Sequence, residues 1–96
     1  VLLTHTPAMR AAYYGARPLA ALRAIADVIL HDSETPLSGH ILAEAAAGCA
    51  AIIADRATPG TAETFAHAPD LIAFLRCAVD VSTIDIDAAS AAGVLV

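Results

Sequence analysis

The segment LIAFLRCAVDVSTIDIDAASAAGVLV, residues 71–96, carries two apolar runs separated by a polar loop and an alanine-rich stretch. The runs Leu71–Leu75 and Val94–Val96 are apolar at consecutive positions, which is typical of strands buried on both faces. The loop Arg76–Thr83 follows the first run and is richer in polar residues than either run. We therefore expect two parallel strands, one at each end of this segment.

The alanine-rich stretch predicts the helix that joins these two strands. Asp85 or Asp87 is suited to the N-cap position, because a carboxylate accepts hydrogen bonds from the first free N–H groups of a helix. The helix then covers Ala88–Ala92, and Gly93 ends it. The segment thus encodes one complete strand–helix–strand unit.

The rest of the chain repeats the same alternation. Three further apolar runs precede this segment: Val1–Leu3, Val28–Leu30 and Ala51–Ala54. Three further helices are expected between them: one from Pro18 to Ala26, one around Ile41–Ala46 with Ser38 as N-cap and Gly48 as the stop, and one from Thr61 that ends before Pro69. These repeats predict an α/β fold, a doubly wound parallel sheet of about five strands with helices on both faces and right-handed crossovers.

The composition excludes several classes of protein. With 58% hydrophobic and 16% charged residues, a chain of 96 residues can form one folded domain and is not intrinsically disordered. The chain has ten acidic residues, five arginines and no lysine, so its net charge is −5 and it contains no basic cluster. We therefore expect neither nucleic acid nor a membrane surface as a partner. The longest uncharged stretches, such as Ala45–Ala54, are also shorter than the ~20 apolar residues of a membrane span.

The two cysteines, Cys49 and Cys77, are expected to be buried free thiols rather than a disulfide. The first residues, Val1–His5, lack the basic segment and cleavage pattern of a secretory signal. Both observations favour a cytoplasmic protein.

Three segments follow the predicted strands: Thr4–Pro7, Asp55–Gly60 and Arg76–Thr83. Ligands of open parallel sheets bind at the carboxyl ends of the strands, so we expect the binding site there. Arg56 and Arg76 are the two cations at this end, and a guanidinium matches a carboxylate or phosphate.

The histidines and tyrosines carry weaker signals. His5 follows the first strand at the same end and is a candidate for ligand contact. The other histidines have no ligand-like spacing with one another or with the cysteines, so no metal site is expected. Tyr13 and Tyr14 are expected to pack against the first helix.

The segment from Leu75 to Val96 resembles the D-isomer-specific 2-hydroxyacid dehydrogenases, whose pattern reads roughly R-x-G-x-G-x-D-N-I-D-x-x-A-A-x-x-x-G-I-x-V. Seven residues fall on matching positions: Arg76, Ile84, Asp85, Ala88, Ala89, Gly93 and Val96. Upstream, Ala45–Thr58 looks like a helix, the third strand and the first substrate loop of that family. The resemblance implies that residues 1–96 form the N-terminal portion of the substrate-binding domain, with a flavodoxin-like fold.

The family binds the substrate carboxylate with backbone N–H groups of the glycine-flanked loop. This chain has Ala78 and Asp80 where the family has two glycines, and Val79 and Asp80 can still offer their N–H groups. Asp80 also places a negative charge beside an expected anion, so its side chain points away, the substrate differs or the site has degenerated. The resemblance therefore implies six substrate-binding residues: Arg56, Thr58, Arg76, Ala78, Val79 and Asp80. Alternatively, Arg56 pairs with Asp55 or Asp80, Arg76 pairs with a helix carboxylate and Thr58 is a turn residue.

No G-x-G-x-x-G follows any strand, so the chain lacks a dinucleotide-binding fingerprint. The resemblance implies that NAD or NADP is bound by a further domain of the full-length protein, which is also where the family carries its catalytic residues. The complete enzyme would interconvert a D-2-hydroxyacid and a 2-oxoacid, whereas these 96 residues alone would be inactive. Apolar surface left uncovered after Val96 would favour self-association into a homo-oligomer.

Two alternatives remain at this point. A receiver-like phospho-acceptor domain would explain Asp55 followed by Pro59-Gly60 after the third strand. Receivers also need an acidic pair after the first strand and a lysine, and this chain has neither. The second alternative is a non-catalytic association domain of the same fold.

Overall fold

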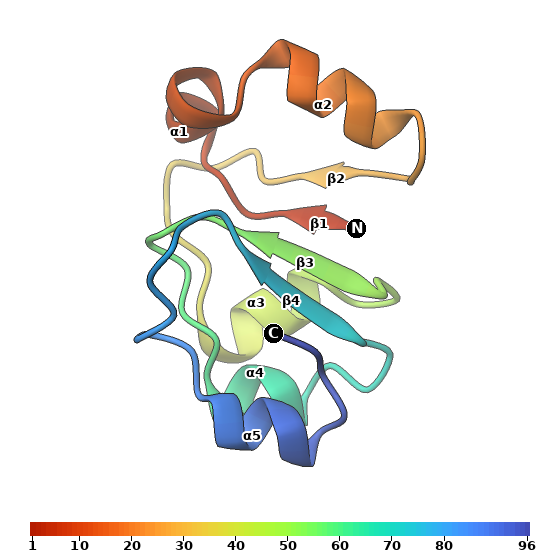
Figure 1. The fold of residues 1–96 in the computed structure, drawn as a ribbon, viewed down its shortest axis with the longest axis vertical. Coiled ribbons are helices and arrows are strands. Elements are labelled where there is room, and N and C mark those ends of the chain that lie inside the picture. Colours follow the sequence, from red (N-terminus) through yellow and green to blue (C-terminus); the bar gives the residue numbers. More distant parts are fainter.

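The computed structural model describes residues 1–96 and contains one sheet of four parallel strands in the order β2-β1-β3-β4 (Figure 1). The strands are β1 (Leu2–Leu3), β2 (Ile29–Leu30), β3 (Ala51–Ala54) and β4 (Ala73–Arg76). In the register of the sheet, Ile52 of β3 lies between Leu2 of β1 and Phe74 of β4. The predicted α/β class and the parallel sheet are confirmed.

Six helical segments connect the strands: α1 (Pro7–Met9), the π-helix η1 (Arg10–Tyr14), α2 (Ala16–Arg23), α3 (Gly39–Ala45), α4 (Ala62–Ala66) and α5 (Ile86–Ala91). Side-chain caps start several of them. Asp85 accepts a hydrogen bond of 2.9 Å from the N–H of Ala88 at α5, as its position in the sequence predicts. Thr61 accepts from the N–H of Thr64 at α4.

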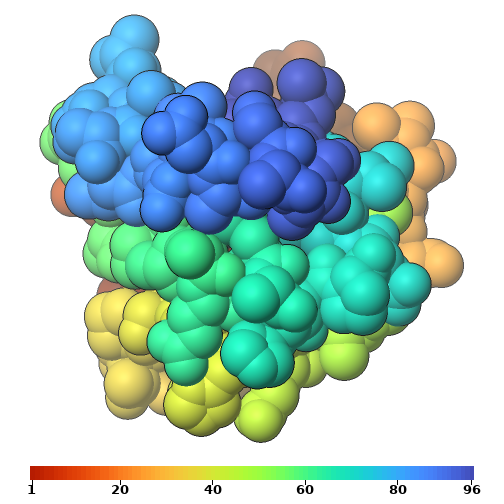
Figure 2. Space-filling view, turned by 90° about the horizontal axis from the view of Figure 1, so that it is seen from below, coloured from red at the N-terminus to blue at the C-terminus, as the bar shows by residue number.

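One face of the sheet carries the hydrophobic core. Leu2, Ile52 and Phe74 project from it and are at most 1% exposed. The ring of Phe74 meets Phe65 of α4 edge to face at a centroid distance of 5.8 Å. Helix α4 contacts both α3 and α5, and the three together cover this face (Figures 1 and 2).

The neighbouring residues of the strands point to the opposite face, which is covered unevenly. Leu3 is fully buried, Ile53 beside it is half-buried, and Leu75 beside Ile53 is 44% exposed. The segments α1, η1 and α2 lie at the β1–β2 end of the molecule (Figure 1), away from β4. This face therefore becomes more exposed from β1 towards β4.

The last apolar run of the chain does not form a full strand. Leu95 makes one parallel bridge with Ala73, with hydrogen bonds from the N–H of Phe74 to the carbonyl of Leu95 and from the N–H of Leu95 to the carbonyl of Ile72. The sheet thus has four strands and one bridge where about five strands were expected.

Three local predictions were wrong. Helix α2 spans Ala16–Arg23 instead of residues 18–26. Ile29 of β2 is 48% exposed because β2 is an edge strand, so this run is not buried on both faces. Cys77 is exposed although Cys49 is buried, because the chain leaves the sheet at the end of β4. Neither cysteine forms a disulfide.

Candidate functional site

A pocket of about 420 Å³ opens at the carboxyl ends of β1, β3 and β4. The strand order reverses between β1 and β3, and ligands of open α/β sheets bind at such a switch point. Eight residues line the pocket: His5, Met9, Tyr13, Asp55, Arg56, Cys77, Ala78 and Val79. They come from the loops after the three strands and from α1 and η1.

Asp55 lines the pocket but is only 3% exposed, and several hydrogen bonds hold its carboxylate. The hydroxyl of Thr4 donates to its Oδ1 at 2.6 Å, and the hydroxyl of Thr58 makes a short hydrogen bond to the same oxygen. The N–H of Ala57 donates to Oδ2 at 3.3 Å. The Thr4 hydroxyl also accepts from the N–H of Asp55 at 3.0 Å, so the carboxylate and the backbone of residue 55 are both fixed.

These hydrogen bonds keep Asp55 ionised. Burial by itself raises the pKa of its carboxyl, but the hydrogen bonds from Thr4, Thr58 and Ala57 favour the charged form, as does nearby His5. The net result is a pKa below the ordinary value. The pocket therefore contains a buried negative charge.

His5 lies beside Asp55 and is also 3% exposed. Its ring packs against Tyr14 at a centroid distance of 5.3 Å, and its buried Nδ1 has no hydrogen-bond partner in the chain. Burial lowers the pKa of His5; Asp55 opposes this effect and Arg10 adds to it. The lowered pKa favours the uncharged imidazole, and the unpaired Nδ1 is unusual because buried polar groups are nearly always hydrogen-bonded.

The loop after β4 offers free backbone donors. The N–H of Cys77 continues the sheet by donating to the carbonyl of Ala54 at 2.8 Å. The next two N–H groups, of Ala78 and Val79, donate to no acceptor within the chain although both residues line the pocket. Successive backbone N–H groups in a turn can form an anion-binding concavity.

Arg76 does not line this pocket, because its guanidinium is used inside the chain. One Nη donates to the carbonyl of Thr58 at 2.7 Å and to the Oγ1 of Thr83 at 2.9 Å, and the other donates to the carbonyl of Asp80 at 3.4 Å. The Nε is buried without a partner. Arg76 therefore joins the loop after β3 to the loop after β4, and it pairs with no helix carboxylate.

The carboxylate of Asp80 does not line the pocket. It accepts hydrogen bonds from the N–H of Ser82 at 2.8 Å and from the Ser82 hydroxyl at 3.0 Å. These bonds lower the pKa of Asp80, and nearby Arg56 and Arg76 lower it further. The Asp80 carboxylate therefore stabilises a local turn and is not part of the pocket lining.

The structure divides the six sequence-predicted residues into two groups. Arg56, Ala78 and Val79 line the pocket, whereas Thr58, Arg76 and Asp80 do not line it and form hydrogen bonds within and between its loops. Arg56 forms no ion pair with Asp55 or Asp80, since the chain's one short ion pair joins two residues elsewhere.

Five lining residues were absent from the predicted set: His5, Met9, Tyr13, Asp55 and Cys77. The position of His5 directly after the first strand was a usable signal. Met9 and Tyr13 reach the pocket through α1 and η1, which no periodicity in the sequence indicates. Tyr13 is 80% exposed and thus does not pack as expected.

Cys77 is the only thiol at the pocket. Burial and the nearby Asp55 raise the pKa of this thiol, while Arg76 partly opposes them. The raised pKa disfavours the thiolate, which is the reactive form of a cysteine.

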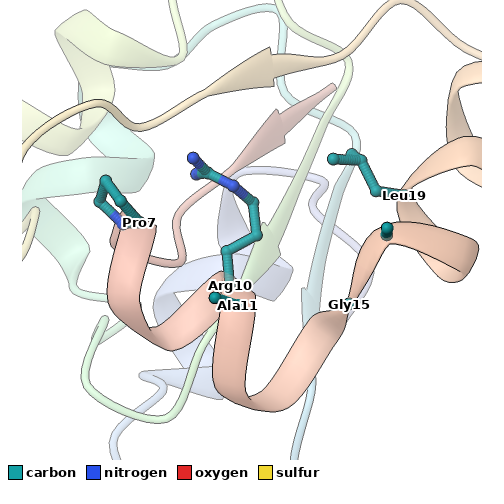
Figure 3. A pocket seen from close by; sticks show the side chains of 6 residues that line it. Pro7, Arg10, Ala11, Gly15 and Leu19 are labelled. Atoms are coloured by element: carbon teal, nitrogen blue, oxygen red, sulfur yellow. The ribbon is translucent and has the colours of Figure 1, made fainter.

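A second hollow, of about 480 Å³, lies between α1, η1 and α2 and is lined by Pro7, Arg10, Ala11, Gly15, Ala16 and Leu19 (Figure 3). Arg10 crosses from η1 and donates to the carbonyl oxygens of His5 and His31, both at 3.2 Å. These bonds fix η1 above the sheet and so place Met9 and Tyr13 at the first pocket.

No helix in the molecule is both long enough and apolar enough to span a membrane.

The comparisons with known proteins agree on one family. The model of the D-isomer specific 2-hydroxyacid dehydrogenase family, catalytic domain, matches residues 1–96. A protein from Polaromonas sp. JS6 66, whose crystal structure is described as that of a D-isomer specific 2-hydroxyacid dehydrogenase, NAD-binding, is similar with a TM-score of 0.78 and 25% sequence identity. The match covers 97% of this chain but only 27% of that protein. No curated protein matches the chain significantly.

Proposed function

The chain belongs to the D-isomer specific 2-hydroxyacid dehydrogenase family, and from this premise we propose that it holds the substrate of such an enzyme. Residues 1–96 would form the N-terminal portion of the substrate-binding domain. The complete protein would be an NAD(P)-dependent oxidoreductase that interconverts a D-2-hydroxyacid and a 2-oxoacid. The match covers only about a quarter of the Polaromonas protein, which supports the proposal that these residues are part of a larger enzyme.

One observation carries the proposal: two consecutive unpaired amides, of Ala78 and Val79, line a pocket at the carboxyl end of β4. A substrate carboxylate bound there would receive two backbone hydrogen bonds. Backbone donors do not depend on the side chain, so alanine and valine serve as well as glycine where space allows. The amide of Asp80 is also unpaired and adjoins them.

The remaining predicted residues would assist this carboxylate site. Arg56 lines the pocket without an ion-pair partner, so its guanidinium is available for the same carboxylate. Thr58 acts through Asp55, and Arg76 acts by holding the loops together. We propose that Thr58 and Arg76 position the site and do not touch the substrate.

The nicotinamide cofactor of the family supplies hydride transfer when it is bound. The residues of this chain do not fit a dinucleotide, because no glycine-rich turn joins a strand to a helix N-terminus. We propose that NAD or NADP is held by another domain of the same protein and that residues 1–96 alone are inactive. The two unpaired cysteines support a cytoplasmic location.

Titration of the ¹⁵N-labelled protein with pyruvate tests the carboxylate site. The amide resonances of Ala78 and Val79 should shift first, and Arg56→Ala should weaken the binding about tenfold. Arg23→Ala, which removes an exposed guanidinium from α2, is the matched control and should leave binding unchanged. Shifts confined to other parts of the chain would refute the proposal.

We also propose self-association, because a specific feature favours it. Leu75 and Leu95 are 44% and 68% exposed at the β4 side of the sheet.

The phospho-acceptor alternative has no such support, because Asp55 is buried and its carboxylate accepts hydrogen bonds from two hydroxyl groups.

A further inference from the structure

The loop after β4 carries a negative charge next to its free amides. Asp80 directly follows Ala78 and Val79, and its own N–H also donates to no acceptor within the chain. The Asp80 carboxylate is exposed and does not line the pocket. Charges act over several ångströms in water, so this carboxylate affects an anion on the neighbouring amides without touching it.

The Asp80 carboxylate is held in place on the loop. The N–H of Ser82 donates to its Oδ1 at 2.8 Å, and the Ser82 hydroxyl donates to its Oδ2 at 3.0 Å. These hydrogen bonds lower the pKa of Asp80, and nearby Arg56 and Arg76 lower it further. A carboxyl group with a lowered pKa is ionised at neutral pH, so Asp80 contributes a full negative charge at a fixed position.

The charged side chains of the pocket and its loops cancel one another. Arg56 lines the pocket, and Arg76 joins the two loops that follow β3 and β4. Their positive charges are matched by Asp55 in the pocket lining and by Asp80 on the loop. Arg56 is the cation available to an anion on the free amides, and Asp80 lies close enough to oppose its charge.

We propose that Asp80 sets the charge selectivity of the carboxylate site: its carboxylate opposes the charge of Arg56 and weakens the binding of an acid more strongly the more negative charge the acid carries. The inference rests on the proposed function and extends it, because it names a residue that controls affinity from outside the pocket lining. Asp80 stands where the family pattern has a glycine, so this charge is a property of this chain.

Asp80→Asn tests the inference, because it removes the charge and keeps an oxygen that can accept from the N–H of Ser82. At low ionic strength the variant should bind pyruvate, which carries one negative charge, about threefold more tightly than the unmodified protein. It should bind 2-oxoglutarate, which carries two negative charges, about tenfold more tightly. Titrations followed at the amides of Ala78 and Val79 measure both affinities. Each acid is compared with itself in two proteins, so the different sizes of the acids cancel.

Salt and matched variants identify the effect as electrostatic. The Debye length falls to about 3 Å in 1 M NaCl, so both gains should shrink to less than about twofold. Asp80→Glu keeps the charge and should stay within about twofold of the unmodified protein. Asp70→Asn removes an exposed carboxylate just before β4, at the opposite end of that strand, and should leave both affinities unchanged.

The outcomes separate this inference from the proposed function. If neither acid shifts the two amides in either protein, the carboxylate site is wrong and both proposals fail. If both acids shift them but Asp80→Asn changes neither affinity, the carboxylate site stands and the inference on Asp80 is overturned. Weaker binding by Asp80→Asn, or an equal gain for both acids that persists in 1 M NaCl, would also overturn it.

Discussion

The guanidinium of Arg76 donates a 2.7 Å hydrogen bond to the carbonyl oxygen of Thr58 and thereby fastens the end of β4 to the loop after β3. The same Nη reaches Thr83, so the loop that carries the free amides of Ala78 and Val79 is closed at its far end. The loop geometry therefore depends on a cation that does not line the pocket.

Removal of this cation should loosen the loop. Arg76→Ala is expected to lower the free energy of unfolding by about 1–3 kcal/mol, because it leaves the carbonyl of Thr58 unpaired. Hydrogen exchange of residues 77–83 should accelerate in the variant. Arg17→Ala on the exposed part of α2 is the control. Unchanged exchange in the loop would show that Arg76 does not support it.

The network around Asp55 should make stability depend on acid pH. Because the folded protein lowers the pKa of Asp55 below the unfolded value of about 3.9, the stabilisation is fully present above that value and is lost as the pH falls through the folded pKa. Thr58→Val removes one of the two hydroxyl donors and should destabilise by about 1–3 kcal/mol at neutral pH. Denaturant unfolding should show this difference shrinking as the pH falls through the folded pKa of Asp55. If the difference in free energy of unfolding stays constant across pH, the stabilisation by Thr58 does not depend on the ionisation of Asp55.

The thiol of Cys77 should react slowly despite its exposure. Partial desolvation of the thiol and the nearby Asp55 raise its pKa above the ordinary value, so a smaller fraction is thiolate at neutral pH. The rate of alkylation by iodoacetamide should reach its midpoint at higher pH than for a free cysteine. In Asp55→Asn that midpoint should move down. An earlier midpoint in the unmodified protein would contradict the raised pKa.

Gly60 should tolerate no side chain. A Cβ there would approach Ile84 Cγ2 to 3.0 Å and Phe65 Cζ to 3.1 Å, both within the core. Gly60→Ala is expected to cost about 1–3 kcal/mol by overpacking. Gly48→Ala, where nothing lies within 4 Å but φ is +77°, should cost about 1 kcal/mol from backbone strain alone. Thermal unfolding of both variants checks the ranking, and a smaller loss at Gly60 would contradict it.

Self-association should depend on the exposed β4 side of the sheet. Leu75→Lys is expected to shift the protein towards monomer in sedimentation velocity, because a charge on this face opposes burial. Ile86→Ser is the control, since Ile86 is equally exposed but lies on α5, which covers the opposite face. A monomeric unmodified protein at high concentration would rule out this surface as an interface.

The positions of the strands and the residues that start and end the helices could be predicted from the sequence. Consecutive apolar residues such as Ile52 and Ile53 indicated parallel strands, and Asp85 indicated the start of α5. These signals are local, since each depends on the pleat of a strand or on the first turn of a helix. The bounds of α2 were less accurate because none of its residues is buried, so no apolar stripe marks its ends.

The site was only partly readable. Free amides at Ala78 and Val79 follow from the end of a strand, and the loop resemblance indicated them. Whether a side chain faces the pocket or the scaffold depends on contacts between loops distant in sequence. Arg56 and Arg76 are the same residue type after neighbouring strands, yet only Arg56 lines the pocket, because the carbonyl of Thr58 lies within reach of Arg76.

Ile52 and Ile53 are adjacent in the chain, yet Ile52 is buried in the core and Ile53 lies on the unevenly covered face. Position 52 resists any change of volume. Positions 53 and 75 tolerate polar residues if that face of the sheet is exposed to water. They require aliphatic residues if another protein surface packs against the face. The variability of these two positions among descendants of this gene would therefore record whether the face is occupied in each lineage.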